Sequence, residues 1–222
     1  MTREMLLHRL AGIIVSINRS HPLRVAIDGI DSAGKTTLAD ELVPLIEQQG
    51  SPVIRASIDG FHRPRQERYQ QGPDSPAGYY EDSFDYAALR AVLLYPFGLH
   101  GSRQYRRAVF DVHTDTPIPA GKKEAPTNAV LLFDGVFLLR PELDSLWDYW
   151  IFVNVDFEVA LQRAMVRDQS LFGSSEAVQA RYLQRYFPGQ RLYFQSVHPQ
   201  ERANVIVENN DPTHPRLIFP IP

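Results

Sequence analysis

The length and composition of this chain are those of an ordinary globular protein. Its 222 residues are 44% hydrophobic and 22% charged, with a formal net charge of −3 and no cysteine. The lack of cysteine excludes disulfides, thiolate metal sites and a cysteine nucleophile. The small net charge gives no reason to expect nucleic-acid or membrane partners, and we expect a cytoplasmic protein with one domain over residues 1–222.

The N-terminal segment has the pattern of an amphipathic helix. Thr2 is a suitable N-cap, and Leu6, Leu10 and Ile17 follow at helical spacing. Its apolar run, residues 11–15, is too short for a signal peptide or a membrane span. We expect the apolar stripe to pack on the body of the protein; the alternative is a surface for a homo-oligomer.

A phosphate-binding motif follows the apolar run at residues 23–28. The segment Gly29 to Thr36 reads GIDSAGKT and precedes a helical pattern, so its backbone N–H groups and the helix N-terminus would face a polyphosphate. Lys35 would reach the β- and γ-phosphates, and the Thr36 hydroxyl would face Mg²⁺. The alternative is a glycine-rich turn without a ligand. The predicted nucleotide contacts are Gly29, Asp31, Ser32, Ala33, Gly34, Lys35, Thr36 and Thr37.

Two further strands end on carboxylates. Residues 52–58 read as a strand that places Asp59 at its carboxyl end, where open α/β sheets bind ligands, and His62 follows in the same loop. Asp59 could take a proton from an attacking hydroxyl; a turn cap is its alternative role, and a solvated loop histidine is that of His62. Residues 129–135 read as a buried strand with Asp134 near its end, suited to hold Mg²⁺ opposite Thr36. A strand-end aspartate without a metal is the alternative.

The remaining segments complete an alternating pattern. We expect an irregular loop over 70–85, a helix over 85–95, a strand at 104–112 that opens a β-hairpin, a strand at 149–155 and a short strand at 205–207. A helix over 157–168 carries Arg163 and Arg167 four residues apart, so both could reach one phosphate or form a solvated face. A second helix, 174–186, should end at Phe187-Pro188-Gly189.

This pattern predicts an α/β protein of the P-loop NTPase type. Its sheet should be doubly wound and mainly parallel, with helices on both faces, a β-hairpin insertion at about 104–128 and a lid at about 163–190. Lys35, Asp59 and Asp134 should meet at the carboxyl edge of the sheet.

The sequence resembles the uridine kinase-like P-loop kinases, a family related to phosphoribulokinase and bacterial pantothenate kinase. The resemblance spans nearly the whole chain and is carried by Val25 to Thr36, Asp59 to His62, Phe110-Asp111, Phe133 to Val136, Arg163 to Asp168 and Ala203 to Ile206. It implies an enzyme that uses ATP and Mg²⁺ to phosphorylate a hydroxyl of a small molecule, with a nucleoside as the expected acceptor.

The same resemblance implies roles for individual residues. Asp59 is the expected base, Asp134 a metal ligand and Arg167 the residue that stabilises the transferring phosphoryl group, with Lys35 on the phosphates. The loop of Glu81 and Asp82 resembles one that holds a ribose diol, and residues 209–212 resemble a loop beside adenine. The expected acceptor contacts are Asp59, His62, Tyr80, Asp82, Asp115 and Arg163.

Three departures from the family pattern leave alternatives open. Asp115 stands where uridine kinases have a histidine facing the pyrimidine, and His62 replaces a stacking aromatic residue. Residues 169–174 lack the further lid arginines, for which Arg181, Arg185 or Arg191 could substitute. The alternatives are therefore a kinase for pantothenate, nicotinamide riboside or a sugar, and a nucleotide-binding switch with little transferase activity.

Overall fold

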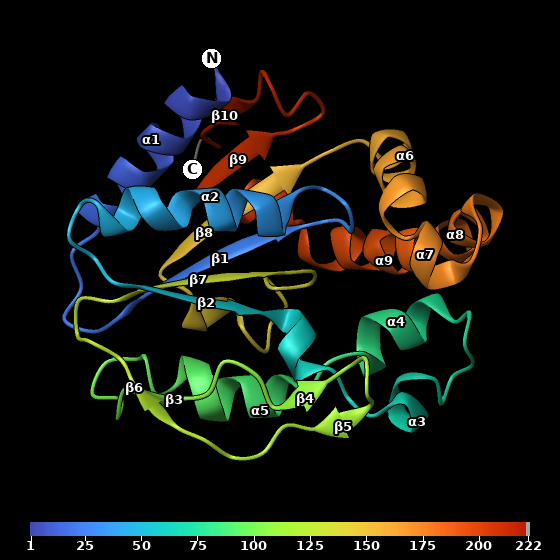
Figure 1. The fold of residues 1–222 in the computed structure, drawn as a ribbon, viewed down its shortest axis with the longest axis horizontal. Helices are drawn as coiled ribbons and strands as arrows, with labels where there is room; N and C mark the ends of the chain where they lie inside the picture. The colour runs from blue at the N-terminus through green and yellow to red at the C-terminus, as the bar shows by residue number, and fades with distance from the viewer. Residues whose placement is uncertain (221–222) are drawn as a thin grey trace.

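A six-stranded sheet forms the centre of the molecule in the computed structural model, which describes residues 1–220 (Figure 1). The strand order is β10-β9-β8-β1-β7-β2, and all neighbours are parallel except the antiparallel pair β9 and β10. The strands are β1 (Leu23–Gly29), β2 (Val53–Ser57), β7 (Val130–Gly135), β8 (Tyr149–Asn154), β9 (Val205–Glu208) and β10 (Arg216–Ile218). The mainly parallel α/β prediction is confirmed; β10 was not predicted.

Helices cover both faces of this sheet. In Figure 1, α1 and α2 lie over one face, α5 lies over the other, and α6 to α9 gather beyond one end. The helices are α1 (Arg3–Ser16), α2 (Lys35–Glu47), α3 (Arg65–Arg68), α4 (Pro76–Asp82), α5 (Tyr86–Leu89), α6 (Phe157–Arg167), α7 (Gln169–Phe172), α8 (Ser175–Arg181), α9 (Phe187–Val197) and α10 (Pro199–Arg202). Short 3₁₀ turns occupy 58–61 and 144–146, and π-helical turns occupy 90–94 and 182–186. Among the described residues, none of the helices combines the length and apolar character needed to cross a membrane.

The hydrophobic core has two parts, one on each face of the sheet. Val25 and Ile27 of β1 point into the part shared with α1 and α2, whereas Ala26 between them points into the other part, with Phe133. This alternation follows from the two-residue period of a strand. Because β1 is buried on both faces along its whole length, the loop that follows it starts from a rigid base.

The N-terminal helix packs as expected. Thr2 caps α1 by accepting a hydrogen bond from the Met5 N–H, and Leu6 and Leu10 are fully buried. Its apolar stripe therefore lies against α2 and the sheet.

The predicted hairpin is broken into two short pairs. β3 (Gln104–Tyr105) pairs with β6 (Lys123–Glu124), and β4 (Phe110–Asp111) pairs with β5 (Thr116–Pro117), each antiparallel. Between them the Arg106 N–H donates to the Val92 carbonyl and the Val109 N–H to the Gly60 carbonyl. Because these two N–H groups bond to segments outside the hairpin, they cannot pair with its other strand. The single strand predicted over 104–112 is therefore wrong.

Two helix predictions need correction. The loop expected at 70–85 contains α4, which Ser75 caps through its side chain and in whose first turn Pro76 lies; this serine–proline pair is a recognisable helix start. The predicted stop at 187–189 is also wrong, because α9 begins there. Pro188 lies in the first turn of α9, where its missing N–H breaks no bond of that helix.

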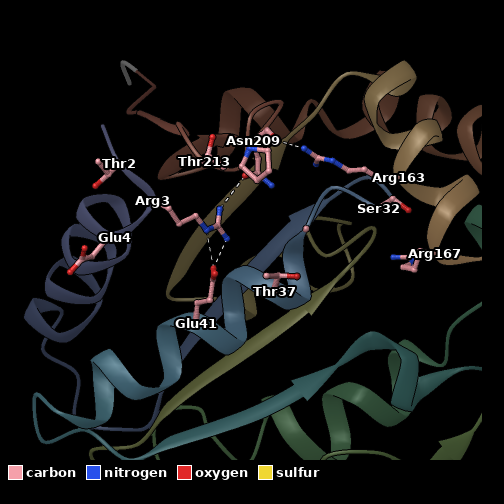
Figure 2. Close-up of a pocket in the computed structure, with 12 residues that line it drawn as sticks. Thr2, Arg3, Glu4, Ser32, Thr37, Glu41, Arg163, Arg167, Asn209 and Thr213 are labelled. Atoms are coloured by element: carbon pink, nitrogen blue, oxygen red, sulfur yellow. Dashed lines mark hydrogen bonds and ion pairs between the residues drawn. The ribbon is translucent and has the colours of Figure 1, made fainter.

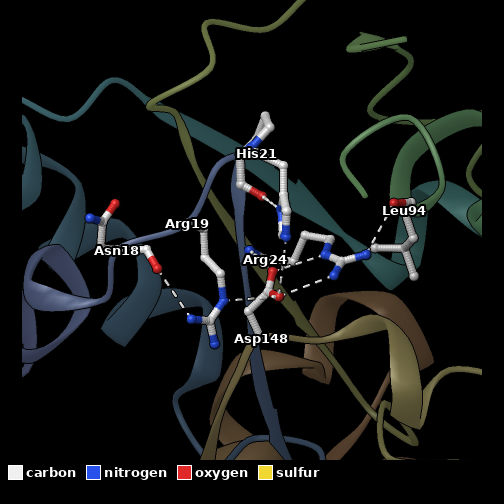
Figure 3. A network of polar contacts seen from close by, with 7 residues as sticks. Asn18, Arg19, His21, Arg24, Leu94 and Asp148 are labelled. Carbon is white, nitrogen blue, oxygen red and sulfur yellow. Dashed lines mark hydrogen bonds and ion pairs between the residues drawn. The ribbon is translucent and has the colours of Figure 1, made fainter. Parts of the chain in front are cut away.

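A network of ion pairs lies at the amino-terminal ends of β1 and β8, the ends remote from the phosphate loop (Figure 3). Asp148 accepts hydrogen bonds from the backbone N–H, Nε and Nη2 of Arg24 at 2.9 to 3.1 Å, and Arg19 approaches it to 3.6 Å. The pKa of Asp148 is lowered because the hydrogen bonds and charge of Arg24 outweigh the effect of burial. The network joins the start of β1 to the segment before β8.

Candidate active site

The loop between β1 and α2 has the backbone of a phosphate-binding loop. Gly29 has φ +152°, and a Cβ atom there would lie 2.5 Å from the Val153 carbonyl oxygen; Gly34 has φ +95°. Both positions therefore require glycine. The Lys35 ammonium is buried and donates to the Ile30 carbonyl at 2.7 Å, so it lies across the loop. Such a loop, followed by a helix N-terminus, attracts anions.

Thr36 and Asp134 meet beside this loop. The Thr36 hydroxyl donates to Oδ2 of Asp134 at 2.6 Å, and Arg55 of β2 donates to Oδ1 at 3.0 Å. Asp134 is 2% exposed, so the Arg55 guanidinium is what compensates its buried charge. The role of Arg55 was not predicted, although an arginine within a buried strand was a signal for it.

Asp59 stands just beyond β2, beside His62. Its carboxylate lies 3.6 Å from the imidazole, and the His62 ring packs on Phe84 with centroids 4.6 Å apart. Partial desolvation beside the cavity raises the pKa of Asp59, although its side chain is 74% exposed, but the nearby His62 imidazole and the charges of Lys35 and Arg167 outweigh this effect and lower the pKa. Asp59 is therefore an ionised acceptor at neutral pH.

Arg167, the last residue of α6, is held by its own neighbours. Its Nε and Nη2 donate to the two oxygens of Asp168 at 2.7 and 3.0 Å, and the Tyr182 hydroxyl also donates to Asp168 at 2.7 Å. Tyr182 reaches the Ser32 hydroxyl at 3.3 Å, which ties this group to the phosphate loop. The hydrogen bonds to Asp168 raise the pKa of Arg167, so its positive charge is permanent.

These groups line one cavity of about 800 Å³, which we call the transfer cavity. It brings Lys35, Asp59 and Asp134 together at the carboxyl ends of β1, β2 and β7, where sequence reasoning placed them. Arg167 closes one side. The predicted site residues that line it are Asp31, Ser32, Lys35, Thr36, Asp59, His62, Asp115, Asp134 and Arg167.

A second cavity of about 690 Å³, the outer cavity, lies on the other side of the loop (Figure 2). Arg3 projects into it from α1 and donates to Glu41 of α2 and, at 3.1 Å, to Asn209. Asn209 in turn donates to the Ala33 carbonyl at 2.8 Å. The loop after β9 is therefore bonded directly to the phosphate loop. Sequence reasoning found this loop but not the contribution of α1.

Arg163 and Thr37 belong to this outer cavity. The Arg163 guanidinium donates to the carbonyls of Asn209 and Asn210 at 2.7 and 3.0 Å. Arg163 thus shares a helix face with Arg167, as its spacing predicted, and both line the outer cavity. Arg163, expected as an acceptor contact, is not among the residues that line the transfer cavity.

Tyr80 and Asp82 are not among the residues that line either cavity. The Tyr80 hydroxyl lies 3.2 Å from that of Ser196, and its ring packs on the Arg140 guanidinium. Asp82 is buried and accepts a hydrogen bond from Gln71 at 2.8 Å. The structure instead turns Tyr79 toward the transfer cavity, because adjacent residues of a helix face different sides.

The three arginines that could substitute for the missing lid arginines, Arg181, Arg185 and Arg191, all contact other parts of the chain. Arg181 donates to the Pro73 carbonyl and to Asp74 at 2.7 and 2.9 Å. Arg185 is 2% exposed and donates to four backbone carbonyls, of Arg68, Gly72, Pro73 and Ser75. The guanidinium of Arg191 packs on the Phe157 ring. Arg181 and Arg185 also line the transfer cavity, but their Nη1 and Nη2 atoms donate to the chain, whereas Nη1 of Arg167 has no hydrogen-bond partner within residues 1–220.

Asp28, directly before the loop, is a buried acid that sequence reasoning missed. It accepts hydrogen bonds from the Gly29 N–H at 2.7 Å and from the Tyr193 hydroxyl of α9. Burial raises its pKa to about 6, against the effect of these hydrogen bonds.

Comparison with known proteins decides the family. A family model described as the phosphoribulokinase / uridine kinase family matches residues 25–213. The chain belongs to this family. Its members are phosphotransferases with a hydroxyl acceptor, and this chain is a P-loop kinase of that type.

Individual relatives agree with this assignment. A uridine kinase of Leuconostoc citreum is 29% identical over 194 residues, covering 84% of this chain and 87% of the relative. A uridine kinase of Brevibacillus brevis is 24% identical over 193 residues, covering 84% and 85%. A structure described as a possible uridine kinase from Bacillus stearothermophilus has a TM-score of 0.72 and 23% identity, covering 91% of this chain and 97% of its own. That likeness shows the shared fold.

Proposed function

We propose that this member of the family transfers the γ-phosphoryl group of ATP to a hydroxyl of a nucleoside. One observation carries the proposal: Lys35, Asp59 and Arg167 line the same cavity, around the Thr36–Asp134 pair. That cavity combines a phosphate-binding loop, an ionised base and a fixed cation, which are the parts that phosphoryl transfer needs. Uridine kinases among the relatives support a nucleoside as the acceptor.

The donor nucleotide spans both cavities in this proposal. Its phosphates lie on the loop amides and Lys35, and its base lies in the outer cavity between Arg163 and the loop at Asn209. The loop is shared by the two cavities, since Ser32 lines both. A nucleotide can therefore reach from the outer cavity to the acceptor side.

The residues present fit Mg²⁺. Thr36 and Asp134 supply oxygen atoms 2.6 Å apart, and Mg²⁺ is usually held by one or two protein oxygens together with phosphates and water. Residues 1–220 contain no cluster of three or more His, Cys, Asp or Glu side chains that could hold a metal, so we expect the ion to arrive with ATP. When bound, it neutralises charge on the β- and γ-phosphates.

The reacting groups follow from this arrangement. As the acceptor oxygen forms its bond to the γ-phosphorus, the bond from that phosphorus to the β–γ bridging oxygen breaks and ADP leaves. Asp59 takes the proton of the acceptor hydroxyl. Arg167 offsets the negative charge on the moving phosphoryl group, and we propose that its segment, 163–190, acts as the lid that excludes water.

The experiment is a panel of acceptors with ATP and Mg²⁺, read by ADP release in the wild type and in Asp59→Asn. We expect one nucleoside to give acceptor-dependent turnover, and the variant to bind ATP while losing that turnover by about 100-fold or more. Slow ADP release that no acceptor increases would instead indicate a nucleotide switch. Unchanged turnover in Asp59→Asn would refute the assignment of the base.

A further inference from the structure

The phosphate loop contains a carboxylate, Asp31, whose place in an anion site needs explanation. A negative side chain pointing into the loop would repel a triphosphate. Asp31 is instead held to the side: its Oδ2 accepts from the Tyr79 hydroxyl of α4 at 2.7 Å and from Nε2 of Gln190 of α9 at 2.8 Å. The side chain is thus directed toward the acceptor side of the loop.

Both donors keep Asp31 in this orientation. Gln190 is 1% exposed and Tyr79 is 6% exposed. Burial, together with the neighbouring Asp31 charge, holds the pKa of Tyr79 well above its ordinary value, so its hydroxyl remains a donor. Because one oxygen takes both hydrogen bonds, the other is left free at a defined place.

That free oxygen is open to the transfer cavity. Within residues 1–220, Oδ1 of Asp31 has no hydrogen-bond partner, yet it is not among the buried unpartnered atoms, and Asp31 lines the cavity. Among the other carboxylates there, both oxygens of Asp134 and of Asp168 accept hydrogen bonds from the protein. Asp115 also lines the cavity and accepts through Oδ1 alone, but it lies outside the phosphate loop. Asp31 is thus an uncommitted acceptor on the same loop as the phosphates.

We propose that Oδ1 of Asp31 accepts a hydrogen bond from a second hydroxyl of the acceptor, while Asp59 takes the proton of the reacting one. This inference rests on the proposed function and narrows its substrate class to polyhydroxylated acceptors, a ribonucleoside before a deoxyribonucleoside. A hydrogen bond to a charged oxygen is among the stronger ones. A site built around it rejects an analogue that lacks the hydroxyl. Asp31 would thereby hold the ribose hydroxyl that the family resemblance assigned to the loop of Asp82, a residue that lies outside the cavity.

The test compares kcat/KM for uridine, 2′-deoxyuridine and 3′-deoxyuridine in the wild type and in Asp31→Asn. The asparagine carbonyl can still accept from Tyr79 and Gln190, so this variant removes the free charged oxygen and keeps the side chain in place. We expect the wild type to prefer uridine over one deoxynucleoside by about tenfold or more. In Asp31→Asn, kcat/KM for uridine should fall by about that factor, so that the preference for uridine disappears.

Two further variants separate contact from positioning. Tyr79→Phe removes one donor but leaves Oδ1, so its preference for the hydroxyl should persist. Tyr80→Phe, on the same helix but outside the cavity, is the matched control. If Tyr79→Phe abolishes the preference as Asp31→Asn does, Asp31 only fastens the loop to α4 and α9, and the inference is wrong.

The remaining outcomes distinguish a failure of this inference from a failure of the proposed function. A wild type that uses uridine and both deoxynucleosides equally overturns this inference and leaves the kinase assignment intact, as does an Asp31→Asn variant that keeps the wild-type preference. A wild type that phosphorylates no nucleoside overturns the proposed acceptor itself, and the inference with it.

Discussion

Thr36 and Asp134 lie 98 residues apart in the sequence and are joined by a hydrogen bond of 2.6 Å. Thr36 lies in the first turn of α2 and Asp134 lies next to the last residue of β7, so the contact exists only because β7 lies beside β1 in the sheet. Arg55, two strands from β1, neutralises Asp134 from the opposite side. In the proposed reaction this pair would offer Mg²⁺ two oxygens that the fold holds in place.

Asp134→Asn should therefore impair metal use. We expect kcat/KM to fall by about 100-fold and the Mg²⁺ concentration for half-maximal rate to rise, because the charged oxygen beside Thr36 is lost. Initial rates over a Mg²⁺ titration measure both. Asp40→Asn is the control, since Asp40 also pairs with Arg55, at 2.9 Å, but is exposed. Equal effects in the two variants would mean that Asp134 serves only to neutralise Arg55.

Substitutions at Arg163 and at Arg167 should affect different kinetic constants, although the two residues share one helix face. Arg167 lines both cavities, whereas Arg163 lines only the outer one and bonds to the loop at Asn209. We expect Arg167→Ala to lower kcat by about 10³-fold, as for other arginines at a transferring phosphoryl group. Arg163→Ala should mainly raise the KM for ATP. Rates measured over a range of ATP concentrations distinguish them; a kcat loss of the same size in both contradicts the division.

His62→Ala should change the pH dependence of the reaction. His62 contributes most to lowering the pKa of Asp59, so its removal raises that pKa and moves the acidic limb of kcat/KM to higher pH. The variant should therefore lose more activity at pH 5 than at pH 7, where Asp59 stays ionised. A pH–rate profile of both proteins measures the shift. An unmoved limb would show that the limb does not report Asp59.

Asp28→Asn should alter stability in a pH-dependent way. The folded-state pKa of about 6 is above the ordinary value of 3.8, so folding favours the protonated acid. This contribution is complete below about pH 4 and is lost as the pH rises through 6. The stability of the wild type relative to the variant should fall by about 2 kcal/mol from pH 4 to pH 7. Urea unfolding at both pH values measures it, and a pH-independent difference contradicts it.

The sequence determined the parts of the site that local backbone chemistry controls. The glycines of the loop, Lys35 and Thr36 occupy fixed positions in a strand–loop–helix unit, and that unit folds in one way. Asp59 and Asp134 were placed correctly because parallel strands present their carboxyl ends at one edge of the sheet. Hydrophobic periodicity likewise predicted the sheet and the stripe of α1.

Only the tertiary structure decided which side chains line the part of the transfer cavity that we propose for the acceptor. Asp31 is turned by Tyr79 and Gln190, which are 48 and 159 residues away, and Tyr79 rather than Tyr80 reaches the cavity because of how α4 packs on α9. Local pattern specifies that a helix forms, but its rotation about its own axis is set by the surfaces it packs on. The phosphate loop is thus a property of a short segment, whereas the side chains that complete the two cavities around it are brought there by the whole fold.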